Sequence, residues 1–254
     1  MNGVLNVYKE QGFTSHDVVA KLRGILKTKK IGHTGTLDPD AVGVLPVCIG
    51  KATKLCDLIT DWGKTYEAVM LLGTTTDTLD ISGKIVAQSE VNVSEVDVLK
   101  ACNEFIGEYE QIPPMYSAKK IDGKKLYQLA REGKIVERKA VPVTLKDIQV
   151  LSVKDNKARF IVTCSAGTYI RTLCVDIGKK LGCEACMSSL TRVMAGGFSK
   201  EQALTLEKIK ELADKNELES RLISIDTALG HFPKVIASNE FEKQLKNGNA
   251  ISIN

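Results

Sequence analysis

The chain has 254 residues, of which 43% are hydrophobic, 26% charged and 5% aromatic. A chain of this length forms one large domain or two modest ones and buries enough apolar surface to need neither disulfides nor a structural metal. Ordinary Gly and Pro contents and the lack of a sequence repeat exclude disorder, collagen and coiled coil. The longest near-apolar run, residues 41–50, is far shorter than the ~20 residues of a membrane-spanning helix.

Cysteine usage and charge narrow the class of protein further. The seven cysteines are an odd number at irregular spacing, and the first residues lack a signal-peptide pattern, which predicts a cytoplasmic protein with free thiols. The net charge is only +4, but basic residues concentrate at 21–30 and 119–139. Such clusters either bind nucleic-acid phosphates or form solvated helix faces, and the charge pattern alone leaves both readings open.

Hydrophobic periodicity, caps and turns predict the elements in chain order. We expect a strand at 4–7, a helix at 15–27, a Gly- and Thr-rich loop at 31–43, a helix at 52–59, strands at 64–72 and 84–87, a helix after Ser94, a short helix at 125–132, strands at 143–153 and 158–164, and helices at 169–181, 206–215 and 240–247. This mixture of elements predicts an α/β or α+β fold.

The loop segment GHTGTLDP, residues 32–39, places a histidine and a carboxylate outside any regular element. Catalytic groups concentrate in loops of this kind. Because the ring of Pro39 restricts the preceding residue, the direction of the Asp38 carboxylate is held. From these residues alone, Asp38 is either a catalytic carboxylate or part of a structural Asp-Pro turn, and His33 is either functional or a loop hydrogen-bonder.

The stretch GHTGTLDPDAVGVLP strongly resembles the active-site motif of the tRNA pseudouridine-55 synthases, the TruB-type family of pseudouridine synthases. Three further stretches agree in the same order: KTYEAVMLLGTTTDTLDISGK, PPMYSAKKIDGKKLYQLAREG and CSAGTYIRTLCVDIGKKLG. The resemblance covers about residues 1–230. It implies a pseudouridine synthase fold, with a mixed, largely antiparallel central sheet flanked by helices and an active site in a basic cleft across it.

The family resemblance also implies the reaction. The expected activity is isomerisation of the T-loop uridine of tRNA, position 55, to pseudouridine, by base flipping and aspartate-dependent cleavage and rejoining of the glycosidic bond. The product is an isomer of the substrate, so no cofactor or metal is expected. The carboxylate can add to C1′ of the ribose or to C6 of uracil, or it can stabilise an oxocarbenium-like sugar, and the sequence does not choose among these routes.

Residue by residue, the resemblance assigns the catalytic roles to three side chains. Asp38 matches the family's nucleophile, and Arg171 matches the arginine that forms a salt bridge with it. Tyr66 matches the strand tyrosine that stacks on the target uracil, and its hydroxyl is a candidate base for the departing proton. Read alone, Tyr66 would be a core-wall residue and Arg171 would equally well be a surface helix residue.

The substrate-binding residues implied by the resemblance fall into two groups. His33 is expected against the gap that the flipped base leaves, and Tyr169 and Leu190 are expected to contact the nucleotide and line the uracil pocket. An insertion at about 116–140 would close over the T-arm, with Lys119, Lys124 and Lys125 contacting phosphates. The expected partner is therefore tRNA, bound by a monomer.

The remaining expectations concern domain limits and rival functions. We expect a catalytic domain at 1–230 and the start of a truncated PUA-like RNA-binding domain at 231–254. One rival is a non-catalytic RNA-folding protein that uses the same basic cleft, and another is a glycoside hydrolase that pairs Asp38 with Asp77 or Asp80. The CxxC of Cys183 and Cys186 lacks a second pair of metal ligands and is expected to be two unlinked thiols.

Overall fold

The computed structural model describes residues 1–230 and 232–251. Its main body is built on a nine-stranded sheet with the order β1-β3-β12-β4-β11-β10-β7, to which β2 and β13 add by pairing with β3 and β12. The strands of this sheet are β1 (Gly3–Lys9), β2 (Ile31–His33), β3 (Val42–Ile49), β4 (Lys64–Leu72), β7 (Gly107–Gln111), β10 (Val141–Lys154), β11 (Lys157–Cys164), β12 (Ala185–Ala195) and β13 (Phe198–Ser199). Two small hairpins are formed by β5 (Thr74–Thr76) with β6 (Ile85–Gln88) and by β8 (Lys120–Ile121) with β9 (Lys124–Lys125).

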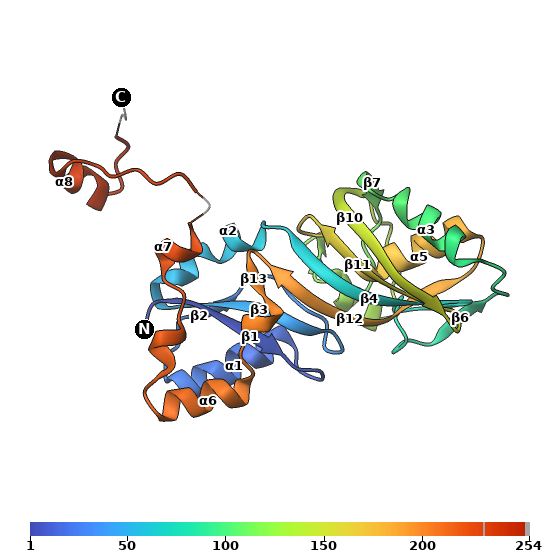
Figure 1. Cartoon of the computed structure of the whole chain (residues 1–254), viewed down its shortest axis with the longest axis horizontal. Coiled ribbons are helices and arrows are strands. Elements are labelled where there is room, and N and C mark those ends of the chain that lie inside the picture. Colours follow the sequence, from blue (N-terminus) through green and yellow to red (C-terminus); the bar gives the residue numbers. More distant parts are fainter. Residues whose placement is uncertain (231, 252–254) are drawn as a thin grey trace.

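Helices flank the sheet in two groups, as Figure 1 shows. The α-helices are α1 (Ser15–Leu26), α2 (Cys56–Thr60), α3 (Glu95–Asn103), α4 (Leu126–Arg131), α5 (Ile170–Leu181), α6 (Leu206–Asp214), α7 (Ile225–Ala228) and α8 (Glu242–Lys246). Short 3-10 helices cover Gly50–Leu55, Lys200–Gln202, Leu218–Arg221 and Asn239–Phe241. One apolar core joins α1 and α6 to β1, β2 and β3, and a second joins α3 and α5 to β4, β10, β11 and β12.

The expected mixed, largely antiparallel sheet flanked by helices is confirmed. Every neighbouring strand pair is antiparallel except β3 with β12, which run parallel where Val42 lies opposite Thr191 and Gly43 opposite Arg192. Gly43 has a φ of +109°, and a side chain there would collide with the Arg192 carbonyl. A glycine is therefore required where the two halves of the sheet meet.

Local sequence signals account for several elements. Thr14 and Asp17 form a capping box at the start of α1, and Ser94 and Asp97 form another at the start of α3. Strand β4 alternates buried and half-buried residues along its whole length, which matches the period of a strand. These positions agree with the elements that the sequence predicts.

The structure also corrects the expected element order. Strands β3, β7 and β12 were not expected, and β2 lies inside the segment 31–43 that was expected as a loop. The single helix expected at 52–59 is a 3-10 helix, Gly50–Leu55, followed by α2. Seven of the eight β3 residues are buried, so the strand has no polar face to reveal its period.

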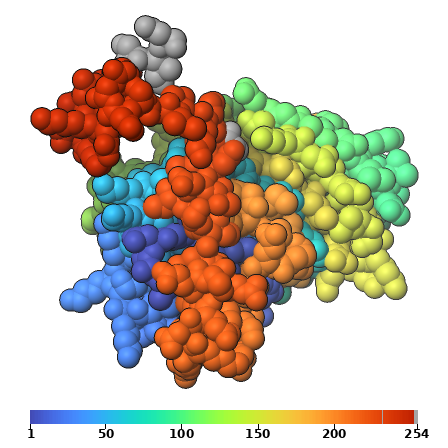
Figure 2. All heavy atoms as spheres, turned by 60° about the vertical axis from the view of Figure 1, so that its left-hand side comes forward, coloured from blue at the N-terminus to red at the C-terminus, as the bar shows by residue number. Residues whose placement is uncertain are grey.

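Residues 232–251 carry a 3-10 turn and α8. Phe232 lies near Trp62 of the main body, with 6.4 Å between the ring centres, whereas α8 stands away from the main body in Figures 1 and 2. Ile236 in this segment is 87% exposed. The expected domain boundary at residue 231 and the expected end of the segment at 252–254 lie outside the described residues. Within the described part of the chain, no helix is both long enough and apolar enough to cross a membrane.

Candidate active site

The loop between β2 and β3 holds Asp38 at one edge of the parallel strand junction. Hydrogen bonds fix the backbone on either side of Asp38. Leu37 N donates to Ser15 Oγ at 2.9 Å, and Pro39 O accepts from Gly12 N at 3.0 Å. The Lys9 ammonium, which is fully buried, also donates to Pro39 O at 3.0 Å. The loop therefore presents the Asp38 carboxylate from a backbone that is hydrogen-bonded on both sides.

Arg171, the second residue of α5, meets Asp38 across the site. Its Nε lies 3.0 Å from Asp38 Oδ2, and its Nη1 lies 3.8 Å from Asp80 Oδ2. Nη1 and Nη2 also donate to the carbonyls of Thr78, at 2.9 Å, and Tyr116, at 2.7 Å. Because the Arg171 side chain is only 6% exposed, it is a preorganised cation that joins three separate segments around one carboxylate.

The environment of Asp38 acts on its pKa in two directions. Burial raises the pKa of Asp38, and the nearby carboxylate of Asp80 adds to that increase. Arg171 opposes both effects, through its charge and its hydrogen bond. The ionisation of Asp38 thus depends on the balance of burial and the Asp80 carboxylate against the charges of Arg171 and Lys9.

Two cavities meet at Asp38. An open cleft of about 860 Å³ runs over the loop, the turn that contains Asp80, and α4. A smaller cavity of about 280 Å³ lies between the same loop, β4, β12 and the start of α5. Asp38, Arg171 and Leu190 line both. The arrangement places a carboxylate at the junction between a wide channel and a cavity large enough for one nucleobase.

Five of the sequence-predicted residues come together in the smaller cavity. Its lining contains Asp38, Tyr66, Tyr169, Arg171 and Leu190. They come from the loop, from β4, from the residue before α5, from α5 and from β12, so one loop, two strands and one helix that are distant in sequence converge there. Burial raises the pKa of Tyr66, which keeps its hydroxyl protonated at neutral pH in the free protein.

His33 lies at the end of β2 and lines neither cavity. Its ring packs edge-on against His16, with 5.2 Å between the ring centres, and His16 does line the open cleft. Burial, followed by the charge of His16, lowers the pKa of His33 to about 4, so the ring is neutral at pH 7. Its expected role beside a flipped base stays a prediction.

The three predicted lysines lie around the β8–β9 hairpin. Only Lys125 lines the open cleft. Its Nζ lies 5.6 Å from the centre of the Tyr127 ring, and Arg131 lies 5.4 Å from the same ring. Lys119 and Lys124 are not among the residues that line either cavity. The hairpin and α4 therefore present one basic-aromatic cluster, Lys125, Tyr127 and Arg131, to the cleft.

Four charged residues near the site are absent from the site residues that the family resemblance implies. They are Asp80, which enters the sequence analysis only as a carboxylate of the rival hydrolase, and the buried cations Lys9, Lys64 and Arg192. Asp77 does not share the site: its carboxylate accepts a hydrogen bond from Lys84 N at 2.8 Å. A charged residue on the inward-facing side of a strand, as Lys64 is in β4, is the sequence signal that could have revealed the buried cations.

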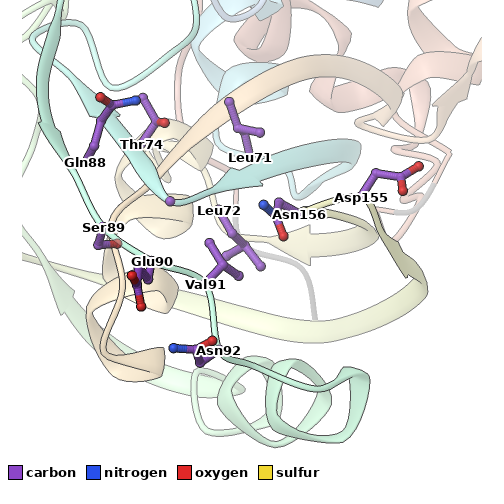
Figure 3. A pocket seen from close by; sticks show the side chains of 11 residues that line it. Leu71, Leu72, Thr74, Gln88, Ser89, Glu90, Val91, Asn92, Asp155 and Asn156 are labelled. Carbon is purple, nitrogen blue, oxygen red and sulfur yellow. The ribbon is translucent and has the colours of Figure 1, made fainter.

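Another hollow, of about 570 Å³, lies at the far end of β4 and shares no lining residue with the two cavities at Asp38. Figure 3 shows Leu71 and Leu72 of β4 beside the segment from Gln88 to Asn92 and the β10–β11 turn with Asn156. None of the predicted site residues lies in it. Across the described residues, no group of three or more His, Cys, Asp or Glu side chains could hold a metal ion.

Two protein-family models match this chain. The family model described as the N-terminal domain of the TruB family pseudouridylate synthases matches residues 23–170, and the model of the tRNA pseudouridylate synthase B C-terminal domain matches residues 171–230. The chain belongs to the TruB family. Together the two matches cover all four stretches on which the sequence resemblance rests, and they confirm that resemblance.

Curated TruB-family relatives match over nearly the whole chain. The tRNA pseudouridine synthase B of Alkaliphilus oremlandii is 49% identical over 254 residues, which are 100% of this chain and 84% of the relative. The corresponding enzyme of Lachnoclostridium phytofermentans is 52% identical over 259 aligned positions, covering 99% of this chain and 84% of the relative. Because these relatives are tRNA pseudouridine synthases and about half of the aligned residues are identical, the chain is an isomerase.

Solved structures agree with the TruB-family fold. The crystal structure of a Cbf5-Nop10-Gar1 complex contains a chain that is 31% identical, with a TM-score of 0.78 over 97% of this chain and 67% of that chain. A second structure, of an H/ACA RNP bound to a substrate RNA containing 2′-deoxyuridine, matches with 29% identity and a TM-score of 0.75 over 98% of this chain and 67% of that chain. The expected pseudouridine synthase fold is therefore confirmed.

Proposed function

We propose that this TruB-family protein converts the uridine at position 55 in the T loop of tRNA into pseudouridine, with Asp38 as its essential carboxylate. The observation that carries the proposal is the position of Asp38. It is paired with Arg171 at 3.0 Å where the open cleft meets the base-sized cavity. The family assignment and the names of its relatives support tRNA as the substrate.

The two cavities divide the substrate between them. The RNA strand follows the open cleft, which Lys125 and Arg131 line and where their charges would meet backbone phosphates. The target base leaves its stack and enters the smaller cavity. There the base lies against Tyr66 and Leu190, with Tyr169 beside the sugar. Asp38 then lies next to the glycosidic bond.

The reaction is an exchange of bonds within one nucleotide. The N1–C1′ bond breaks, the base turns, and a bond between C5 and C1′ forms. C5 loses its proton and N1 ends with one. Asp38 serves as an ionised group, whether it adds to C1′ or to C6 or stabilises the cationic sugar. Arg171 holds it in that form and in that direction. Tyr66, which is protonated in the free protein, is proposed to give its hydroxyl proton to N1 and to take up the C5 proton in its place.

The other parts of the chain are assigned in the same proposal. Residues 1–230 form the catalytic unit, the segment at about 116–140 clamps the T-arm, and residues 231–254 belong to a PUA-like RNA-binding segment. We also propose that the chain acts as a monomer in the cytoplasm. It needs no cofactor, because an isomerisation requires no redox partner and no co-substrate. The Lys125–Tyr127–Arg131 cluster supports the clamp.

Release of tritium from a T-arm hairpin with 5-tritiated uridine tests the proposal. C5 must lose its hydrogen when it becomes the glycosidic carbon, so the wild type should release tritium and Asp38→Asn should not. Both proteins should bind the hairpin equally in a filter-binding assay. No release by the wild type, with hairpin binding intact, would contradict the enzymatic proposal and favour the RNA-folding protein.

A further inference from the structure

Two buried cations form one wall of the smaller cavity. Arg192 is fully buried and Lys64 is 6% exposed, and both line the cavity that contains Asp38 and Tyr66. Strands β4 and β12 bring them there, because Arg192 lies directly opposite Tyr66 in the antiparallel pair. Side chains alternate along a strand, so Lys64 shares a face with Tyr66 two residues away.

The hydrogen bonds of Arg192 are incomplete, whereas Lys64 has two carbonyl acceptors. Arg192 Nε donates to Val44 O at 2.7 Å and Nη2 donates to Gly35 O at 3.2 Å. Nη1 is buried and has no hydrogen-bond partner among the described residues. Lys64 Nζ donates to the carbonyls of Thr60, at 2.6 Å, and Trp62, at 3.0 Å. Both cations therefore bond backbone carbonyls, and the side-chain group that interacts with Arg192 is the Tyr66 hydroxyl rather than a carboxylate.

Such an arrangement is costly for a folded protein without its substrate. Removing a charge from water is unfavourable unless an opposite charge or several acceptors replace the lost hydration. Burial, with the charge of Arg192, lowers the pKa of Lys64 to about 8, which still leaves it protonated at neutral pH. An unpartnered donor on Arg192 beside a second cation indicates a ligand that brings negative charge or a strong acceptor.

The proposed reaction creates such a charge inside this cavity. When the N1–C1′ bond breaks, its electron pair stays on the base, and the negative charge spreads over N1 and the two carbonyl oxygens of uracil. A base that lies against Tyr66 also lies beside Arg192, since the two residues are cross-strand neighbours. The charge is consumed when C5 attacks C1′, so it exists only between the two steps.

We propose that Arg192, with Lys64 in the same cavity wall, donates its Nη1–H to a carbonyl oxygen of the flipped uracil and stabilises the negative charge of the base while it is detached from the sugar. This inference rests on the proposed function and adds a specific binding role for two residues outside the Asp38–Arg171 pair. A preorganised donor directed at developing charge is among the strongest contributions that a site can make to a rate.

The experiment compares two substrates whose bases differ in acidity. T-arm hairpins carry either uridine or 5-fluorouridine at the target position, and the fluorine stabilises the base anion without help from the protein. Single-turnover disappearance of the starting nucleoside is followed by nuclease digestion and chromatography. The variants are Arg192→Met, Arg192→Lys and Lys64→Met. Arg159→Met is the matched control, because Arg159 is an exposed cation paired with Glu67 on the same sheet.

We expect Arg192→Met to slow conversion of uridine by about 10²-fold, in line with the loss of one donor to a developing oxyanion. The loss should be clearly smaller with 5-fluorouridine, Arg192→Lys should recover part of the uridine rate, and Arg159→Met should match the wild type on both substrates. Equal losses on the two substrates, with the wild type active on both, would overturn the inference and leave the proposed function intact.

Two further controls keep the outcomes distinct. If Arg192→Met fails to fold by circular dichroism, Lys64→Met carries the same two-substrate comparison, and equal losses for that variant overturn the inference. If the wild type converts neither hairpin although it binds both, the proposed function itself fails, and the inference fails with it.

Discussion

Arg171 and Asp38 form an ion pair, with Nε 3.0 Å from Oδ2, although one residue lies in the first turn of a helix and the other in a loop before β3. The same guanidinium donates to the carbonyls of Thr78 and Tyr116. One buried cation thus positions the carboxylate and also fixes the two segments that form the rim of the cleft. Removing it should affect orientation as well as charge.

Arg171→Lys tests this geometry directly. A lysine keeps the positive charge but cannot donate to Asp38, Thr78 and Tyr116 at once, so Asp38 loses its direction. We expect a fall in the single-turnover rate of tritium release of about 10²-fold or more, with hairpin affinity little changed. A lysine variant with wild-type activity would show that Arg171 contributes charge alone.

Asp80→Asn should shift the acidic limb of the pH–rate profile to lower pH. Activity requires ionised Asp38 and is lost as the pH falls through its pKa, and the Asp80 charge raises that pKa. An asparagine removes the charge but can still accept the hydrogen bonds from Thr78 and Ser82. The measurement is the rate of tritium release from pH 4.5 to 8.

Asp77→Asn is the control for this prediction, because Asp77 lies in the same turn but bonds only the backbone of Lys84 in the described structure. Its profile should superimpose on that of the wild type. An unchanged acidic limb in Asp80→Asn would mean that Asp80 does not act on the ionisation of Asp38.

His33 should stay neutral throughout the physiological range. Burial and the neighbouring His16 lower its pKa to about 4, so its imidazole gains no proton between pH 8 and about pH 5. Nuclear magnetic resonance of the histidine ring nitrogens, assigned with a His33→Gln variant, measures this. A titration of the His33 ring with a midpoint near pH 6.5 would contradict the expected burial.

Lys9 should make the stability of the fold depend on alkaline pH. Its Nζ donates to the carbonyls of Glu10, Phe13 and Pro39, and burial lowers its pKa to about 8. In the unfolded chain a lysine keeps its proton to about pH 10.4. Between these values the unfolded state binds more protons, so the contribution of Lys9 to the free energy of unfolding rises with pH.

The comparison protein is Lys9→Met, which leaves the three carbonyls without their donor and should be less stable at pH 7 by about 1–3 kcal/mol. Urea unfolding at pH 7, 8, 9 and 10 measures both proteins. The stability of the wild type relative to the variant should increase above pH 8. A constant difference across this range would show that Lys9 does not release its proton in the folded state.

Sequence patterns predicted those helices and strands whose signals lie within a few residues along the chain. The alternation of β4, the caps of α1 and α3 and the glycine that ends α5 each depend on residues a few positions apart, and each agrees with the structure. Family resemblance added Asp38 and Arg171, and the structure places them in contact. Strand β3 escaped prediction because a strand buried on both faces shows no polar alternation. Strand β12 escaped it because two register shifts interrupt its alternation of buried and exposed residues.

The sequence by itself therefore determined the fold class, the loop that carries Asp38 and five of the residues that line the base-sized cavity. The tertiary structure alone decided which charges share a site. Asp80 meets Arg171 through a turn, and Arg192 meets Tyr66 through the register of two strands far apart in the chain. Strand register is set by packing of the whole sheet, so no local pattern could indicate that Arg192 is buried beside the cavity with a free donor.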